Sequence, residues 1–104
     1  MNSEELQRIQ KSCADLAARK NNDYGAKMDN IGLTGQHGIS VRLVDKVSRV
    51  FSLTHPGTQQ KVNDESIRDT LMDVMNYAAF GIMLLDGTWT GETSNENADT
   101  ARKV

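Results

Sequence analysis

Two segments of this chain place charged side chains at the spacing of a helix turn, and each segment has its own kind of charge. The segment 38–50 carries a mostly cationic set, namely Arg42, Asp45, Lys46 and Arg49. The segment 65–78 carries acids and an amide, namely Glu65, Asp69, Asp73 and Asn76. Side chains at such intervals share one face of a helix. The two sets predict a site for a charged small molecule, or two faces that pair with each other or with water.

The acidic set could bind a metal ion. Carboxylates one helical turn apart project in the same direction, which suits a hard divalent cation such as Mg²⁺. Asn76 could add a neutral oxygen or bind the edge of a nucleotide base. The alternative is a solvated helix face, which is the usual state of an isolated acidic helix.

The cationic set also has two interpretations. Arg42, Lys46 and Arg49 could form salt bridges to the acids of the other segment, and such surface pairs contribute little each. The guanidinium groups could instead hold a phosphate through two parallel hydrogen bonds. The residues alone leave both interpretations open.

A weaker signal lies between these segments and the N-terminus. Gly32, Gly35 and Gly38 have the spacing of a phosphate loop, but no Gly-Lys-Ser/Thr ending follows and no strand precedes them, so a flexible loop is expected. Tyr24, in Asn-Asn-Asp-Tyr-Gly, could stack on a base or close the edge of a core. No Ser/His/Asp or Cys/His set indicates nucleophilic catalysis.

Composition limits the classes of function. The 104 residues predict one domain, and a net charge of −2 gives no basic excess for binding duplex nucleic acid. The single cysteine, Cys13, excludes an intrachain disulfide and a cysteine-based zinc cluster, and its place on an apolar stripe predicts a buried thiol. No signal peptide or membrane span is expected, so a cytosolic protein is predicted. The low hydrophobic content of 38% predicts a core completed by self-association into a homo-oligomer.

The helices that position these residues can be placed from caps and breakers. Ser3 is expected to cap a first helix that ends near Lys20. An irregular loop is expected over 26–38, followed by a second helix over 39–53 that His55-Pro56-Gly57 stops. A third helix is expected from Asn63 or Asp64 to Leu85.

The predicted fold is all-α, with three main helices, a long glycine-containing loop and a helical bundle completed by oligomerisation. A single domain is expected over 1–89, with a polar tail over 90–104 that Trp89 docks. Apolar residues at helical spacing are expected to face inward, with the polar set of the third helix nearly opposite. They are Leu6, Ile9, Cys13, Leu16 and Ala17 in the first helix, Ile39, Leu43, Val44, Val47, Val50 and Phe51 in the second, and Ile67, Leu71, Val74, Ala78, Ile82 and Leu85 in the third.

Three blocks of sequence resemble a known family. They are Lys-Asn-x-Asp-Tyr-Gly from Lys20, Ile-x-Val-Arg-x-x-Asp-Lys-x-x-Arg over 39–49 and Glu-Ser-Ile-x-Asp-Thr-Leu-x-Asp-x-x-x-Tyr-Ala over 65–78. Together they resemble the nucleotide modification associated domain that is widespread in bacteriophages, from about Lys20 to Leu85. The resemblance implies a phage or prophage origin, the cytoplasm of an infected bacterium and a nucleotide as ligand.

That domain is in turn similar to the MazG-like all-α nucleotide pyrophosphohydrolases, which hold Mg²⁺ with a Glu-x-x-Glu pair and a Glu-x-x-Asp pair. Asp69 and Asp73 match the second pair loosely, at a spacing of four instead of three. Asp45 is the only acid at the first pair. Two-metal phosphate chemistry needs several carboxylates, so this departure weakens the case for catalysis and leaves nucleotide binding intact.

Two hypotheses follow, beside a third in which the chain is a helical accessory subunit without a ligand. The first is a protein that binds a linear or cyclic nucleotide and sequesters this signal against host defence. Its ligand-binding residues would be Asn22, Asp23, Tyr24, Arg42, Asp45, Lys46, Arg49, Asp69, Asp73 and Asn76. The alternative is an Mg²⁺-dependent nucleotide pyrophosphohydrolase that acts on the nucleotide pool. Its metal ligands would be Glu65, Asp69 and Asp73.

Overall fold

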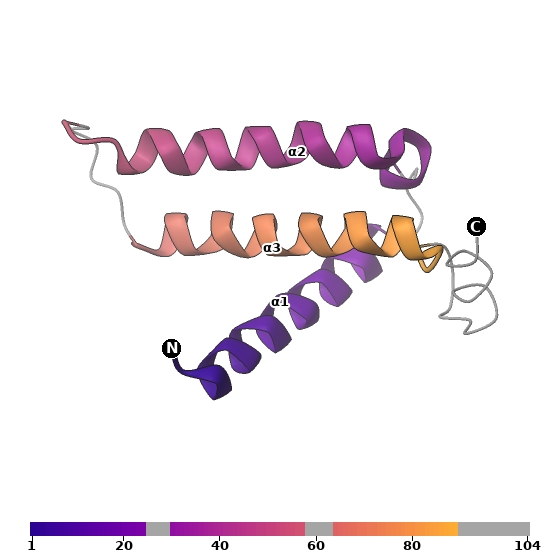
Figure 1. Cartoon of the computed structure of the whole chain (residues 1–104), viewed down its shortest axis with the longest axis horizontal. Coiled ribbons are helices and arrows are strands. Elements are labelled where there is room, and N and C mark those ends of the chain that lie inside the picture. The colour runs from indigo at the N-terminus through magenta and orange to yellow at the C-terminus, as the bar shows by residue number, and fades with distance from the viewer. Residues whose placement is uncertain (25–29, 58–63, 90–104) are drawn as a thin grey trace.

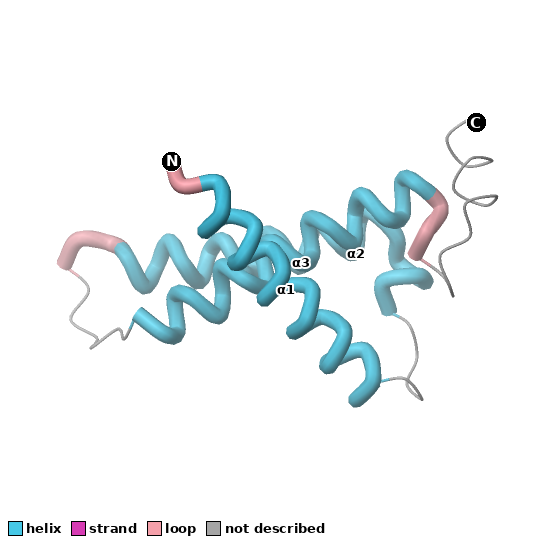
Figure 2. Tube along the Cα trace, turned by 90° about the horizontal axis from the view of Figure 1, so that it is seen from below, coloured by secondary structure: helices cyan, strands magenta, loops and turns pink. Residues whose placement is uncertain are grey.

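The computed structural model describes residues 1–24, 30–57 and 64–89. These residues form three helices and no strand: α1 (Ser3–Tyr24), α2 (Asn30–Thr54) and α3 (Asp64–Asp86). The helices α2 and α3 run side by side in opposite directions, and α1 crosses α3 at an angle (Figure 1). Seen from below, α1 again runs diagonally to the other two helices (Figure 2). The predicted all-α fold is confirmed.

The first helix is longer than expected and has a different cap. The Asn2 side-chain oxygen accepts a hydrogen bond from the Glu5 backbone N–H at 3.1 Å, so Asn2 is the N-cap and the prediction of Ser3 was wrong. Glu4 and Glu5 lie in the first turn, where the helix dipole favours acids. The helix continues past Lys20 to Tyr24, because no residue in that stretch breaks the helical backbone.

The second helix begins earlier than expected. The prediction of an irregular loop over 26–38 was wrong from Asn30 onward, because α2 includes the glycine-rich stretch. Gly35 interrupts the helix with φ 63° and ψ −148°, a conformation in the left-handed region that glycine adopts without a steric penalty. The stretch is therefore a kinked helix and not a phosphate loop. Residues 25–29 lie outside the described residues.

Packing on α3 explains why this glycine-rich stretch stays helical. The Gln36 side-chain N–H donates a hydrogen bond of 2.6 Å to the Gly81 carbonyl oxygen on α3. A Cβ on Gly81 would lie 3.2 Å from Gln36 Oε1 and 3.4 Å from Ile39 Cγ2, which is tighter than or at the edge of normal contact. Glycine at position 81 therefore allows α2 and α3 to approach closely at this point.

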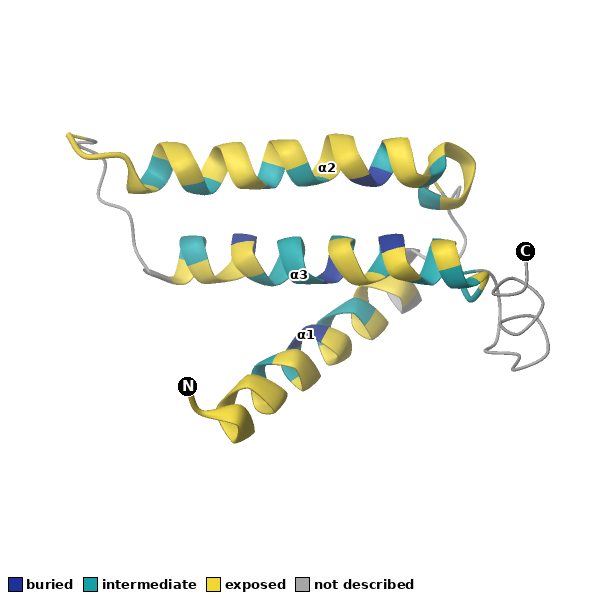
Figure 3. Ribbon diagram, viewed as in Figure 1, coloured by how far each residue is buried: buried dark blue, intermediate teal, exposed yellow. Residues whose placement is uncertain are grey.

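The apolar residues are buried less than the sequence pattern predicted. Among the described hydrophobic residues, only Cys13 and Ile39 are buried. Most of α2 is coloured as exposed, whereas much of α3 is coloured as intermediate (Figure 3). Seven residues that were expected to face inward are exposed in this chain, which corrects the prediction: Val44, Val47, Phe51, Leu71, Ala78, Ile82 and Leu85. Leu6 is exposed as well. Sequence periodicity identifies the apolar face of a helix, but it does not identify the element that packs against that face.

The side of α3 that faces the other helices is instead partly polar. Thr70 and Asn76 are buried there, and Asp73 is half-buried.

Beyond the end of α3, the Trp89 ring packs edge-on against Phe80 with ring centroids 5.0 Å apart. The tail from residue 90 lies outside the described residues. None of the described helices combines the length and apolar character needed to cross a membrane.

Candidate functional site

The three helices meet at the carboxylate of Asp73. One oxygen of Asp73 lies 3.1 Å from the Lys20 ammonium on α1, and the other lies 3.2 Å from the Lys46 ammonium on α2. Within the described residues, α1 packs against α3 and not against α2, so Asp73 connects two helices that do not pack on each other. We call Lys20, Lys46 and Asp73 the charge cluster.

The burial of the charge cluster is uneven. The Asp73 side chain is 20% exposed, whereas Lys46 is 34% and Lys20 is 49% exposed. Ion pairs at this level of exposure contribute on the order of 0.2–1 kcal/mol each. Stability alone is therefore a weak reason for the cluster. With two ammonium groups around one carboxylate, the cluster has a net positive charge that can attract an anion.

A buried amide lies one helical turn from Asp73. Asn76 is 9% exposed, and among the described residues none forms a hydrogen bond with its side chain. Buried polar groups in folded proteins are mostly hydrogen-bonded. The nearby hydroxyl of Thr70 follows that rule, because it donates to the Ser66 carbonyl at 2.9 Å. No described side-chain oxygen or nitrogen is both buried and without a hydrogen-bond partner. The Asn76 amide is therefore not orphaned, and its role in binding a ligand stays a prediction.

The remaining predicted cations lie along the same helix as Lys46. Arg42 and Arg49 are exposed, and neither forms an ion pair with any described part of the chain. Their positions one turn before and after Lys46 put all three cations on one face of α2. Of the predicted salt bridges between the two charged segments, the structure contains the Lys46–Asp73 pair. Whether the two guanidinium groups hold phosphate stays a prediction.

The predicted acids are divided by the fold. Asp73 joins the charge cluster, while Glu65 and Asp69 are exposed on α3 and Asp45 is exposed on α2. In the described ranges, no group of three acidic, histidine or cysteine side chains lies close enough to hold a metal ion. Glu65, Asp69 and Asp73 thus do not form a complete metal site by themselves, and Asp73 already faces two ammonium groups.

The motif Asn22-Asp23-Tyr24 forms the last residues of α1, directly after Lys20. The backbone of this motif is helical, and its side chains lie outside the described residues. Their predicted role in binding a nucleotide stays a prediction.

Sequence reasoning missed two components of this region. Lys20 was not among the predicted ligand-binding residues, although it is the first residue of the block that carries the family resemblance. The second component is an aromatic row at the C-terminal end of α3. The ring centroids of Tyr77 and Phe80 are 5.8 Å apart, and Trp89, just beyond the helix, packs on Phe80. The spacing of Tyr77 and Phe80 along a helix was the available signal, because residues three apart share one face of a helix.

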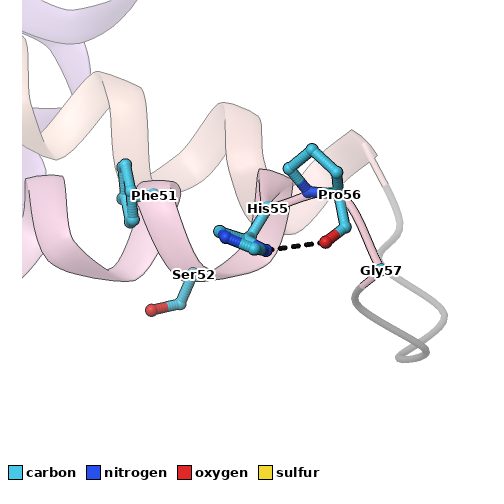
Figure 4. Close-up of a pocket in the computed structure, with 5 residues that line it drawn as sticks. All are labelled: Phe51, Ser52, His55, Pro56 and Gly57. Carbon is cyan, nitrogen blue, oxygen red and sulfur yellow. Dashed lines mark hydrogen bonds between the residues drawn. The ribbon is translucent and has the colours of Figure 1, made fainter.

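A shallow hollow lies elsewhere, at the C-terminal end of α2. It is lined by Phe51, Ser52, His55, Pro56 and Gly57 (Figure 4). The His55 ring nitrogen Nδ1 lies 2.7 Å from the Pro56 carbonyl oxygen, which turns the ring toward the chain that follows the helix. No acid, arginine or lysine lines this hollow, so it does not contain the predicted site.

One comparison with known proteins identifies the family of this chain. A family model described as nucleotide modification associated domain 1 matches residues 20–85. The matched stretch begins at Lys20 and includes Lys46, Asp73 and Asn76. Neither the curated proteins nor the solved structures contain a match to this chain.

Proposed function

This chain belongs to the nucleotide modification associated domain 1 family, and from its nucleotide-related role we propose that it binds a nucleotide at the charge cluster. The observation that carries the proposal is the half-buried Asp73 between Lys20 and Lys46, with two exposed guanidinium groups on the same helix as Lys46. A nucleotide combines phosphate charge, ribose hydroxyls and an aromatic base. The described residues offer a group for each.

The groups have distinct roles in this proposal. Arg42, Lys46 and Arg49 hold phosphate oxygens, and the arginines do so with paired N–H donors. Asp73 orients the two lysines and accepts a hydrogen bond from a ribose hydroxyl. The Asn76 amide reads the edge of the base, since an amide supplies both a donor and an acceptor.

The biological role that fits this chemistry is sequestration. We place the protein in a phage or prophage, where it would hold a linear or cyclic nucleotide signal of host defence in the cytoplasm of the infected bacterium. Sequestration requires tight binding without bond cleavage, so it needs no complete set of metal ligands in the described chain. The resemblance to a domain widespread in phages supports this role.

A second candidate is an Mg²⁺-dependent nucleotide pyrophosphohydrolase. The observation in its favour is that Glu65, Asp69 and Asp73 follow one another at turn spacing on α3, and the MazG-like similarity points the same way. In this candidate the ion would bridge phosphate oxygens and offset their charge. The ammonium groups beside Asp73 argue against it, because they occupy both carboxylate oxygens.

One experiment separates the two candidates. The protein is incubated with linear and cyclic nucleotides, with Mg²⁺ or with EDTA, and the supernatant and the heat-released material are analysed by mass spectrometry. Sequestration predicts intact nucleotide recovered after heating, with or without EDTA. Hydrolysis predicts monophosphate and pyrophosphate in the Mg²⁺ sample only. Full recovery of every nucleotide in the unheated supernatant would contradict both.

A further inference from the structure

The helix pair has an exposed apolar face. It consists of Leu33, Val44, Val47 and Phe51 on α2 and of Leu71, Ile82 and Leu85 on α3. We call these residues the apolar face. Their exposed fractions run from 47% for Leu71 to 69% for Leu85. Isolated exposed apolar residues are normal, whereas a row of them on adjoining helices indicates an interaction surface.

The apolar face crosses from one helix to the other at the end that carries Phe51 and Leu71. A shallow groove between them is lined by Val47, Val50, Phe51, Thr54, Leu71 and Val74. The bonds Gln36–Gly81 and Lys46–Asp73 fix how α2 and α3 align in opposite directions. Leu33 therefore lies toward the same end of the pair as Leu85, and Phe51 lies toward the same end as Leu71.

The described chain has too small a core to leave this face uncovered. Burial of apolar surface is the main favourable contribution to folding, and the net stability of a domain is only about 5–15 kcal/mol. Here the described hydrophobic residues that are buried are Cys13 and Ile39. The side chains that would normally supply the rest of a core lie on the apolar face.

The segments between and after the described helices offer little apolar surface. The segments 25–29, 58–63 and 90–104 contain few large apolar residues, which are Met28, Val62 and Val104. A second copy of the chain supplies a matching apolar surface. The apolar face carries no charge, so the same face of a second copy can meet it about a two-fold axis without like charges coming together.

We propose that the apolar faces of two copies of this chain pack against each other, so that α2 and α3 of both copies form a four-helix bundle. The dimensions fit: α3 has 23 residues, which gives a length of about 35 Å at 1.5 Å per residue. Two helices about 10 Å wide then offer about 700 Å² per copy, close to the roughly 800 Å² that a stable interface uses on each side.

The bundle leaves the charge cluster outside the interface. Leu71 and Asp73 are two residues apart on α3, so their side chains point to nearly opposite sides of the helix. The helix α1, which brings Lys20, packs on the side of Asp73. Pairing through the apolar face therefore does not depend on a nucleotide, and a failure of nucleotide binding would leave this proposal unaffected.

The test measures the mass of the purified full chain by light scattering at micromolar concentration. The expected mass is an even multiple of the 11.5 kDa chain, and the melting temperature should rise with protein concentration because dilution favours dissociation. The variants Val47→Glu and Ile82→Glu should each lower the mass toward one chain. Both positions are more than half exposed in a single chain, so a monomer would accommodate glutamate at either position.

The matched control is Ala18→Glu, which adds the same charge at an exposed position of α1. It should keep the mass and the melting temperature of the original protein. If Val47→Glu or Ile82→Glu loses its helical circular dichroism while Ala18→Glu keeps its own, the proposal is supported, because folding then requires the apolar face. A wild-type mass of one chain with a melting temperature independent of concentration overturns it. So does an assembly whose mass both glutamate variants leave unchanged.

Discussion

The Lys46 ammonium on α2 lies 3.2 Å from one carboxylate oxygen of Asp73 on α3, while Lys20 on α1 lies 3.1 Å from the other. A single side chain thus contacts cations from both of the other helices. Asp69, one turn earlier on α3, is exposed and forms no ion pair with the described residues. This contrast between two acids on one helix gives the sharpest test of the site.

We expect Asp73→Asn to weaken nucleotide binding at least tenfold, because the lysines lose the group that orients them and the ribose loses an acceptor. Asp69→Asn should change affinity less than threefold. Calorimetry with the nucleotide that the panel identifies measures both. If an Asp69→Asn/Asp73→Asn double variant folds normally and binds as the original protein does, neither acid belongs to the site.

Arg49→Ala should weaken binding by about 1.5–3 kcal/mol, the scale of a hydrogen bond to a charged group. Arg49→Lys should restore only part of the loss, because an ammonium cannot make the planar two-pronged contact. The matched control is Arg68→Ala, which removes an exposed arginine from α3. Equal affinities for Arg49→Ala and Arg68→Ala would reduce Arg49 to a general surface charge.

Two glycines of α2 should respond to alanine in opposite directions. Gly35→Ala forces an alanine into a φ of 63° and should lower the free energy of unfolding by about 1–2 kcal/mol. Gly32 lies before the kink and has an ordinary helical φ. The variant Gly32→Ala should therefore raise the free energy of unfolding by roughly 0.5–1 kcal/mol. Urea unfolding at one fixed protein concentration compares them. A Gly35→Ala variant as stable as Gly32→Ala would show that α2 has no kink.

The Cys13 thiol should react slowly while the protein is folded. Burial raises the pKa of this thiol. The Arg68 charge offsets part of that rise, and the Asp73 charge adds to it. The folded state therefore holds the thiol proton more tightly than the unfolded state, and the stability from this difference is complete below the ordinary thiol pKa. It is lost as the pH rises through the folded pKa.

Alkylation by iodoacetamide, followed by mass spectrometry, checks this prediction. At mildly alkaline pH the folded protein should be modified much more slowly than the protein in urea. The difference in alkylation rate between the folded and the unfolded protein should become smaller at higher pH. Equal rates in both states at mildly alkaline pH would mean that Cys13 is not buried.

The sequence was sufficient to predict the all-α fold, because helix caps, Pro56 and the apolar repeat act over one or two turns of chain. It also predicted the burial of Cys13, which is 2% exposed and lies with its sulfur 3.7 Å from the Met75 sulfur. The loop prediction over 26–38 failed because the glycines suggested a break. The contact of Gln36 with Gly81, far apart in sequence, holds that stretch in a helix.

The site was predicted in part for the same reason. The face shared by Arg42, Lys46 and Arg49 follows from local spacing alone. Which acid meets Lys46 depends on how α2 is aligned along α3, and this alignment is a tertiary property. The role of Lys20 depends on the angle at which α1 crosses α3. Local sequence patterns give neither the alignment of α2 along α3 nor the crossing angle of α1. Asp69 and Asp73 could therefore not be distinguished from the sequence.

The bond from the Gln36 amide to the Gly81 carbonyl joins two groups that carry no charge and do not titrate. Neither salt nor pH within the ordinary range should shift the alignment of α2 along α3 at this point. The contacts of Asp73 with Lys20 and Lys46 are electrostatic and partly exposed, so dissolved ions weaken them. Concentrated salt should therefore weaken the ion pair between α1 and α3, while the Gln36–Gly81 bond still holds α2 against α3 at that point.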